Sequence, residues 1–162
     1  MKLISADVTN YRSILDSNPV KIGQSTCLVG KNEAGKTAFL KALEGINSTD
    51  SGYTSYNKTE NYPRRFLADY DERHEGDNAQ VITTEWELDD SDIALLVEEF
   101  GEDVVSGDKM TIKKTYDQTG TIWTVPINEV VLLNKLIARY GLSDDDAKVV
   151  NESTSTWLAA YR

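Results

Sequence analysis

The stretch GKNEAGKT, residues 30–37, matches the phosphate-binding loop pattern G-x-x-x-x-G-K-[ST] at every fixed position. Its glycines let the backbone curl so that successive N–H groups point at phosphates, and a following helix presents its positive N-terminal end to the same anion. In this interpretation Lys36 reaches the β- and γ-phosphates and Thr37 gives its hydroxyl to Mg²⁺. The residues predicted to hold a nucleoside triphosphate are Gly30, Ala34, Gly35, Lys36 and Thr37.

The context of the loop favours this interpretation over an ordinary glycine turn with an exposed lysine. The pattern is expected by chance in well under about 1% of chains this long. The apolar stretch Ser25–Val29 predicts a strand before the loop, Lys36–Leu43 predicts a helix after it, and Gly45 is a plausible helix stop. Strand, glycine loop and helix therefore follow in the order that phosphate binding requires.

The rest of the chain predicts an α/β fold of the P-loop NTPase class, with a mixed sheet around the loop helix and additional antiparallel strands. The expected strands are Leu3–Thr9, Val20–Ile22, Val81–Leu88 and a hairpin of Met110–Tyr116 with Thr121–Val125, and the expected helices are Asp92–Phe100, one from Pro126 to a stop at Gly141, and one from Ser143 onward. Residues 1–46 form the expected core, residues 47–79 an irregular insertion and residues 80–162 the further strands and helices of a single lobe.

Composition is that of an ordinary globular chain, with 40% apolar and 27% charged residues among 162. The sequence has no apolar run near the roughly eighteen residues that span a membrane, and no signal-peptide pattern. Its one cysteine, Cys27, lies in an apolar stretch that predicts a buried strand, which fits a reducing compartment. We therefore expect a cytoplasmic protein without membrane partners.

The formal net charge of −10 is unevenly distributed. Residues 1–50 hold six of the 17 Lys and Arg residues and five of the 27 Asp and Glu residues, so the acidic excess lies after the loop. Because such a balance repels phosphate backbones, we expect DNA, if it is a partner, to be bound by other regions.

Two segments together resemble a known family. Residues 27–37, CLVGKNEAGKT, preceded by residues 8–14, VTNYRSI, resemble the start of ABC-type ATPases of the RecF, SMC and OLD branch, over about the first 45 residues. The resemblance implies ATP as the nucleotide, Asn32 near the γ-phosphate or attacking water, and Arg12 beside the phosphates or sugar. The alternative for Arg12 is a solvated turn residue. The resemblance also implies a homodimer of ATPase heads and hydrolysis coupled to work on DNA, in repair or, with an effector nuclease, in phage defence.

The groups that would break the phosphate bond are not recognisable in this sequence. The family places a second carboxylate at the end of an apolar strand, but the look-alike Ile93–Glu99 lacks the Asp and has helical spacing. A Ser-Gly-Gly-Gln-like signature is also absent. The catalytic residues are therefore unknown, and we expect this chain to be the N-terminal lobe of a longer ATPase, truncated in an apolar stretch at Arg162 and inactive alone.

Two other functions compete with the ATPase hypothesis. One is a switch that binds ATP without turnover and docks a protein partner through residues 47–79. The other is a P-loop kinase or GTPase, which is disfavoured because residues 10–13 and Asn32 have no role there. His74 lies in the charged run of residues 71–77, with no second histidine and no cysteine near it, and is expected to be a solvated loop residue rather than part of a metal site.

Overall fold

The computed structural model describes residues 1–31, 34–46, 56–116 and 121–141. These residues belong to two compact units, the first made of residues 1–89 and 108–125 and the second of residues 90–107 and 126–162. Each unit is described by itself below. The predicted helix from Ser143, and the hairpin turn at residues 117–120, lie outside the described residues.

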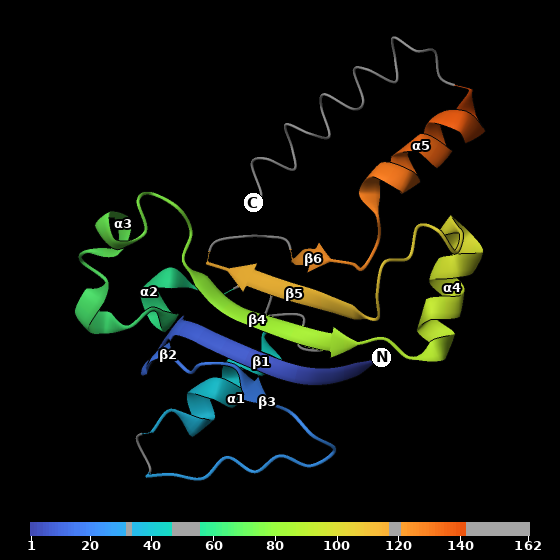
Figure 1. Cartoon of the computed structure of the whole chain (residues 1–162). Helices are drawn as coiled ribbons and strands as arrows, with labels where there is room; N and C mark the ends of the chain where they lie inside the picture. The colour runs from blue at the N-terminus through green and yellow to red at the C-terminus, as the bar shows by residue number, and fades with distance from the viewer. Residues whose placement is uncertain (32–33, 47–55, 117–120, 142–162) are drawn as a thin grey trace. The chain divides into compact units, whose positions relative to one another are not determined.

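The first unit is built on a six-stranded antiparallel sheet with the order β2-β1-β4-β5-β6, in which β3 also pairs with β1 (Figure 1). The strands are β1 (Lys2–Tyr11), β2 (Ile14–Asp16), β3 (Val20–Lys21), β4 (Gln80–Glu87), β5 (Lys109–Thr115) and β6 (Ile122–Thr124). The central pair joins distant parts of the chain, with Leu3 opposite Trp86. The predicted strands Leu3–Thr9 and Val81–Leu88 are thus confirmed as β1 and β4, and the predicted hairpin strands as β5 and β6. The observed ends of these strands lie within about two residues of the predicted ends.

The loop helix α1 (Lys36–Glu44) also agrees with the sequence prediction, and Gly45 is its C-cap. It buries Ala38, Phe39 and Ala42 in the core together with Val8 of β1. A helix of nine residues is too short to be stable by itself, so this packing against the sheet holds it in place. The α/β architecture expected for a P-loop protein is confirmed.

Residues 56–79 were expected to be irregular, and the structure instead contains α2 (Lys58–Asn61), the 3₁₀ turn η1 (Arg64–Phe66) and α3 (Tyr70–Arg73). The turns are fixed by tyrosines rather than by a helical apolar face, because Tyr56, Tyr62 and Tyr70 are each 3% exposed or less. The Tyr62 and Tyr70 rings meet edge to face at 4.8 Å. Because these large side chains are irregularly spaced, the sequence has no hydrophobic periodicity from which these turns could be predicted.

The strand expected at Ser25–Val29 is wrong. None of the described strands pairs with this stretch, Cys27 is exposed rather than buried, and Val29 is 86% exposed. An apolar, β-branched stretch favours extended backbone, but a strand forms only where a neighbouring strand supplies hydrogen bonds. The short strand β2, which the sequence reading missed, does have that neighbour in β1, with Tyr11 opposite Ile14.

The second unit contains α4 (Asp90–Phe100) and α5 (Glu129–Tyr140), both close to the predicted bounds. Asn128 caps α5 by accepting a hydrogen bond from the Val131 N–H at 3.2 Å, and Gly141 ends it in the left-handed conformation at φ 60°. Ile93–Glu99 lies within α4, as the helical spacing predicts. No helix in the described ranges is long and apolar enough to cross a membrane.

Candidate nucleotide-binding site

The loop turns at two glycines with positive φ, Gly30 at 154° and Gly35 at 87°. Gly35 is also the N-cap of α1. A Cβ built on Gly35 would lie 2.9 Å from Ile14 Cγ1 and 3.5 Å from Ser13 Oγ. Only glycine therefore lets the loop adopt this turn while it lies directly against the start of β2.

Lys36 lies across the mouth of the loop. Its Nζ donates hydrogen bonds to the carbonyl oxygens of Gly30 at 2.7 Å and of Lys31 at 2.6 Å, and its side chain is half-buried. These contacts hold the ammonium group against the carbonyl oxygens of the loop. The Ala34 N–H also donates to the Lys31 carbonyl at 3.1 Å, which closes the turn.

The first turn of α1 fits an anion and a hard cation. Gly35 has no side chain with which to cap the helix, and no acidic residue lies in the first turn. Within this turn, no carboxylate opposes the positive end of the helix dipole. Thr37 is exposed in the same turn and offers a hydroxyl oxygen, the kind of ligand that Mg²⁺ accepts.

Of the predicted loop residues, Ala34, Gly35 and Lys36 lie together along one groove of about 390 Å³, whereas Gly30 and Thr37 are not among its lining residues. Asn32 lies outside the described residues. The lining of the groove includes Ser13, Ile14, Leu28, Ala34, Gly35, Lys36 and Phe39. The roles of these residues in nucleotide binding, and that of Thr37 toward Mg²⁺, stay predictions.

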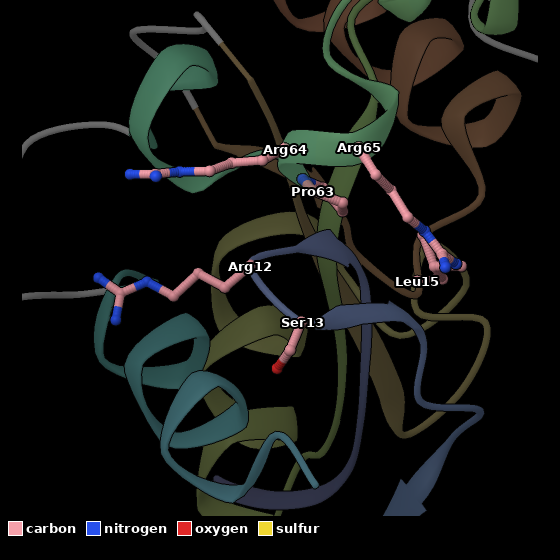
Figure 2. Close-up of a pocket in the computed structure, with 6 residues that line it drawn as sticks. All are labelled: Arg12, Ser13, Leu15, Pro63, Arg64 and Arg65. Atoms are coloured by element: carbon pink, nitrogen blue, oxygen red, sulfur yellow. The ribbon is translucent and has the colours of Figure 1, made fainter. Parts of the chain in front are cut away.

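Arg12 occupies the turn between β1 and β2 with a positive φ of 53°. Its N–H donates to the Asn61 carbonyl at 2.5 Å, and its guanidinium lies 5.4 Å from the Tyr11 ring centroid. The side chain is exposed, yet it lines a cavity of about 490 Å³ that shares Ser13 with the groove beside the loop (Figure 2). Arg12 is thus near the loop, and its contact with a nucleotide stays a prediction.

Sequence reasoning missed two charged neighbours of Arg12. Arg64 and Arg65 line the same cavity, and both extend from η1. The only sequence signal was a pair of arginines after Pro63, inside a segment without periodicity. The positions of Arg64 and Arg65 in the sequence do not show that they lie near Arg12. That arrangement depends on the hydrogen bond from the Arg12 N–H to the Asn61 carbonyl.

His74 is not the solvated loop residue that was expected. It is half-buried, and its Nε2 lies 3.0 Å from the Tyr62 hydroxyl. Burial, and then the charge of Arg73, lower the pKa of His74. Within the described ranges no three His, Cys, Asp or Glu side chains converge as a metal-binding group.

Comparison with known proteins identifies a family for this chain. A family model described as an AAA ATPase domain matches residues 1–162, the whole chain. No curated protein matches the sequence. The match includes the loop, residues 56–79 with their buried tyrosines (the tyrosine-rich segment) and the second unit.

Proposed function

Because this chain belongs to the AAA ATPase domain family, we propose that residues 30–37 bind ATP with Mg²⁺. The family carries nucleotide binding and ATPase activity in general. The observation that carries the assignment to this site is the Lys36 ammonium, held across the loop by the Gly30 and Lys31 carbonyls next to an uncapped helix N-terminus.

The residues of the loop would divide the work as follows. Lys36 exchanges its two carbonyl acceptors for oxygens of the β- and γ-phosphates, and the first N–H groups of α1 donate to the same phosphates. The Thr37 hydroxyl ligates Mg²⁺, which when bound neutralises phosphate charge. Gly35 keeps the backbone close to the phosphates, where a Cβ would collide with Ile14.

A thermal-shift measurement tests this assignment. Millimolar Mg²⁺-ATP at about 100 times its Kd stabilises a protein by about 2.7 kcal/mol, which raises Tm by about 5–10 °C for a chain of this size. We expect this shift in the wild type and none in Lys36→Ala. Lys41→Ala is the matched control, because Lys41 lies on the same helix but pairs with Glu44 at 2.7 Å. A wild type without any shift at millimolar ATP would refute nucleotide binding.

The finer assignment is to the RecF, SMC and OLD branch. It is supported by residues 8–14, because Ser13 and Ile14 of that motif lie directly against Gly35. In this proposal ATP joins two ATPase heads into a homodimer, and hydrolysis drives work on DNA in repair or, with an effector nuclease, in phage defence. Because the acidic excess after residue 50 would repel a phosphate backbone, we propose that other regions contact DNA.

Dimer formation and turnover can be measured separately. Sedimentation of the full-length protein should show a dimer with a non-hydrolysable ATP analogue and Mg²⁺, and a monomer with Lys36→Ala. Phosphate release by the 162-residue chain alone should not exceed that of Lys36→Ala, since its sequence contains no run of four apolar residues followed by Asp-Glu. Repeated turnover by this chain would show that its own residues supply the missing carboxylate.

A second candidate is an ATP-binding switch that docks a protein through the segment after α1. It is favoured by two hydrogen bonds from that segment to the site, from the Tyr56 hydroxyl to the Ala42 carbonyl at 2.6 Å and from the Arg12 N–H to the Asn61 carbonyl. Hydrogen exchange tests it. Mg²⁺-ATP should slow exchange in residues 56–79 as well as in α1, and protection confined to the loop and α1 would leave the ATPase as the better proposal.

A further inference from the structure

The two ends of α1 differ in how their backbone groups are bonded. At the N-terminal end, Gly35 has no side chain with which to cap the first N–H groups. At the C-terminal end, the Tyr56 hydroxyl donates to the Ala42 carbonyl at 2.6 Å. The Lys114 Nζ donates to the Gly45 carbonyl at 2.9 Å. The last carbonyls of a helix have no partner within the helix, so side chains from two distant segments satisfy groups that would otherwise be unpaired.

The register of the sheet directs Lys114 toward this end of the helix. Lys114 on β5 lies opposite Ile82 on β4, and residues opposite each other in antiparallel strands project to the same face. Ile82 is fully buried in the core that also contains Phe39 of α1. Lys113, opposite Thr83, projects to the other face of the sheet. Of two adjacent lysines, only Lys114 is therefore on the side of α1.

The environment of Lys114 explains why it binds a carbonyl. The side chain is half-buried, and burial lowers the pKa of its ammonium group. In the part of the chain that the structure describes, this ammonium forms no ion pair. It faces instead the C-terminal end of α1, where the aligned peptide groups concentrate partial negative charge. Lys114 is thus placed to stabilise the end of the helix rather than a carboxylate.

The packing around Gly45 makes this closure tight. A Cβ built on Gly45 would lie 2.6 Å from Cε1 of Tyr56, so a side chain there would displace the ring from the helix end. The Tyr56 ring meets Tyr11 of β1 edge to face at 5.6 Å. The C-terminal end of α1 is therefore attached to β1 through Tyr56 and to β5 through Lys114.

The position of one end of α1 affects the other. The helix has nine residues, so about 13 Å separates its ends, and its direction decides where the N–H groups of its first turn point. A binding site needs its groups within about 0.5 Å of the productive geometry, and the hydrogen bonds of supporting residues maintain that geometry. A bond at the C-terminal end can thus support a ligand at the N-terminal end.

We infer that Lys114 is a positioning residue for the nucleotide site. Its bond to the Gly45 carbonyl fixes the direction of α1, so that the loop and the first turn of the helix are arranged for phosphates before they bind. Lys114 acts through the helix and does not touch the nucleotide. This inference rests on the proposed binding of Mg²⁺-ATP at residues 30–37 and deepens it, because it gives β5 a part in holding the site.

The test measures the Kd of Mg²⁺-ATP by isothermal titration calorimetry on the 162-residue chain, at a temperature where every variant is folded. Lys114→Met keeps the apolar stem and removes the ammonium, and we expect Kd to rise about three- to tenfold, as the loss of a charged hydrogen-bond donor predicts. Lys114→Arg, which keeps a cation on a long side chain, should restore Kd to within about twofold of wild type. Lys113→Met is the matched control on the other face, and its Kd should change less than about twofold.

A second control separates positioning from general stability. Tyr70→Phe removes a hydroxyl that accepts a hydrogen bond from the Ala79 N–H at 2.8 Å, a bond that does not involve α1. We expect it to lower Tm about as much as Lys114→Met does, but to leave Kd unchanged. If Tyr70→Phe raises Kd as much as Lys114→Met, affinity follows stability and the inference is wrong.

Two further results would overturn the inference. One is a Kd for Lys114→Met equal to that of wild type, and the other is a Kd for Lys114→Arg as high as that of Lys114→Met. Either result leaves the proposed function intact, because wild type still binds Mg²⁺-ATP. A wild type that does not bind Mg²⁺-ATP refutes the proposed function itself, and the positioning role of Lys114 with it.

Discussion

The loop at residues 30–37 and the segment at residues 56–79 both lie against the turn between β1 and β2, but they are built in opposite ways. The loop is recognisable from its sequence, and those of its residues that the structure describes are largely exposed, with a half-buried Lys36 and an exposed Thr37. The segment has no motif, yet Tyr56 and Tyr62 are each only 1% exposed. In this chain the residues with recognisable chemistry contribute little to packing, whereas the buried residues of the segment have no sequence motif by which to recognise them.

Removing a tyrosine ring from the segment should have the largest effect on stability. Tyr62→Ala deletes a fully buried ring that contacts Tyr70 and Tyr116 edge to face, so we expect a loss of about 3–5 kcal/mol in urea unfolding. Lys36→Ala, the equivalent change in the loop, should cost about 0.5 kcal/mol or less without nucleotide, because it removes only exposed hydrogen bonds. If Tyr62→Ala and Lys36→Ala lose similar amounts of stability, the two regions do not differ in how much they contribute to packing.

A pair of glycines tests the same difference, because one lies in each region and the two have nearly the same φ. Gly35 has φ 87° and would carry a Cβ 2.9 Å from Ile14, whereas Gly76 has φ 85° with nothing within 4 Å of a Cβ. Gly76→Ala should cost about 1–2 kcal/mol from backbone strain alone. Gly35→Ala should cost about 1 kcal/mol more and should also weaken Mg²⁺-ATP binding. If the two variants lose the same stability, the contact between a Cβ at position 35 and Ile14 is relieved without cost, and the expectation for Gly35→Ala is wrong.

The hydrogen bond between the segment and α1, the helix that follows the loop, can be removed without leaving a cavity. Tyr56→Phe deletes the hydroxyl that donates to the Ala42 carbonyl at 2.6 Å, and we expect a loss of about 1 kcal/mol in chemical unfolding. Tyr140→Phe is the control, because Tyr140 is 71% exposed, and its stability should be unchanged. If Tyr56→Phe leaves the stability unchanged, packing of the ring alone connects the segment to α1.

The smallest effect concerns His74, whose pKa is lowered by burial and by Arg73. The unfolded chain then binds the proton more readily than the folded one, so stability falls as the pH drops through the usual histidine range near about 6.5. We expect wild type to lose stability relative to His74→Gln between neutral and mildly acidic pH, measured by urea unfolding at each pH. Asp7, whose pKa is raised by burial and by Asp16, acts in the opposite direction at lower pH. Parallel curves for wild type and His74→Gln would contradict the assignment.

Local signals explain which parts of the fold could be predicted. The helix after the loop, α5 and the β5–β6 hairpin follow from caps, glycine stops and alternation, all of which lie within a few residues of the element they define. The strand at Ser25–Val29 and the burial of Cys27 were wrong because a strand depends on a partner that local sequence does not reveal. Arg64 was missed for the same reason, since its relation to Arg12 depends on a bond between residues far apart in the chain.

The central pairing of β1 with β4 also sets an order of events during synthesis. Leu3 finds its partner only when Trp86 is available, and the loop, α1 and the tyrosine-rich segment all lie between these residues. Closing so long an intervening chain has an entropic cost that nearby contacts do not have, and such non-local pairing slows folding. We therefore expect the first strand to remain without its central partner while the loop is made, so that the phosphate-binding surface gains its final geometry only after β4 joins the sheet.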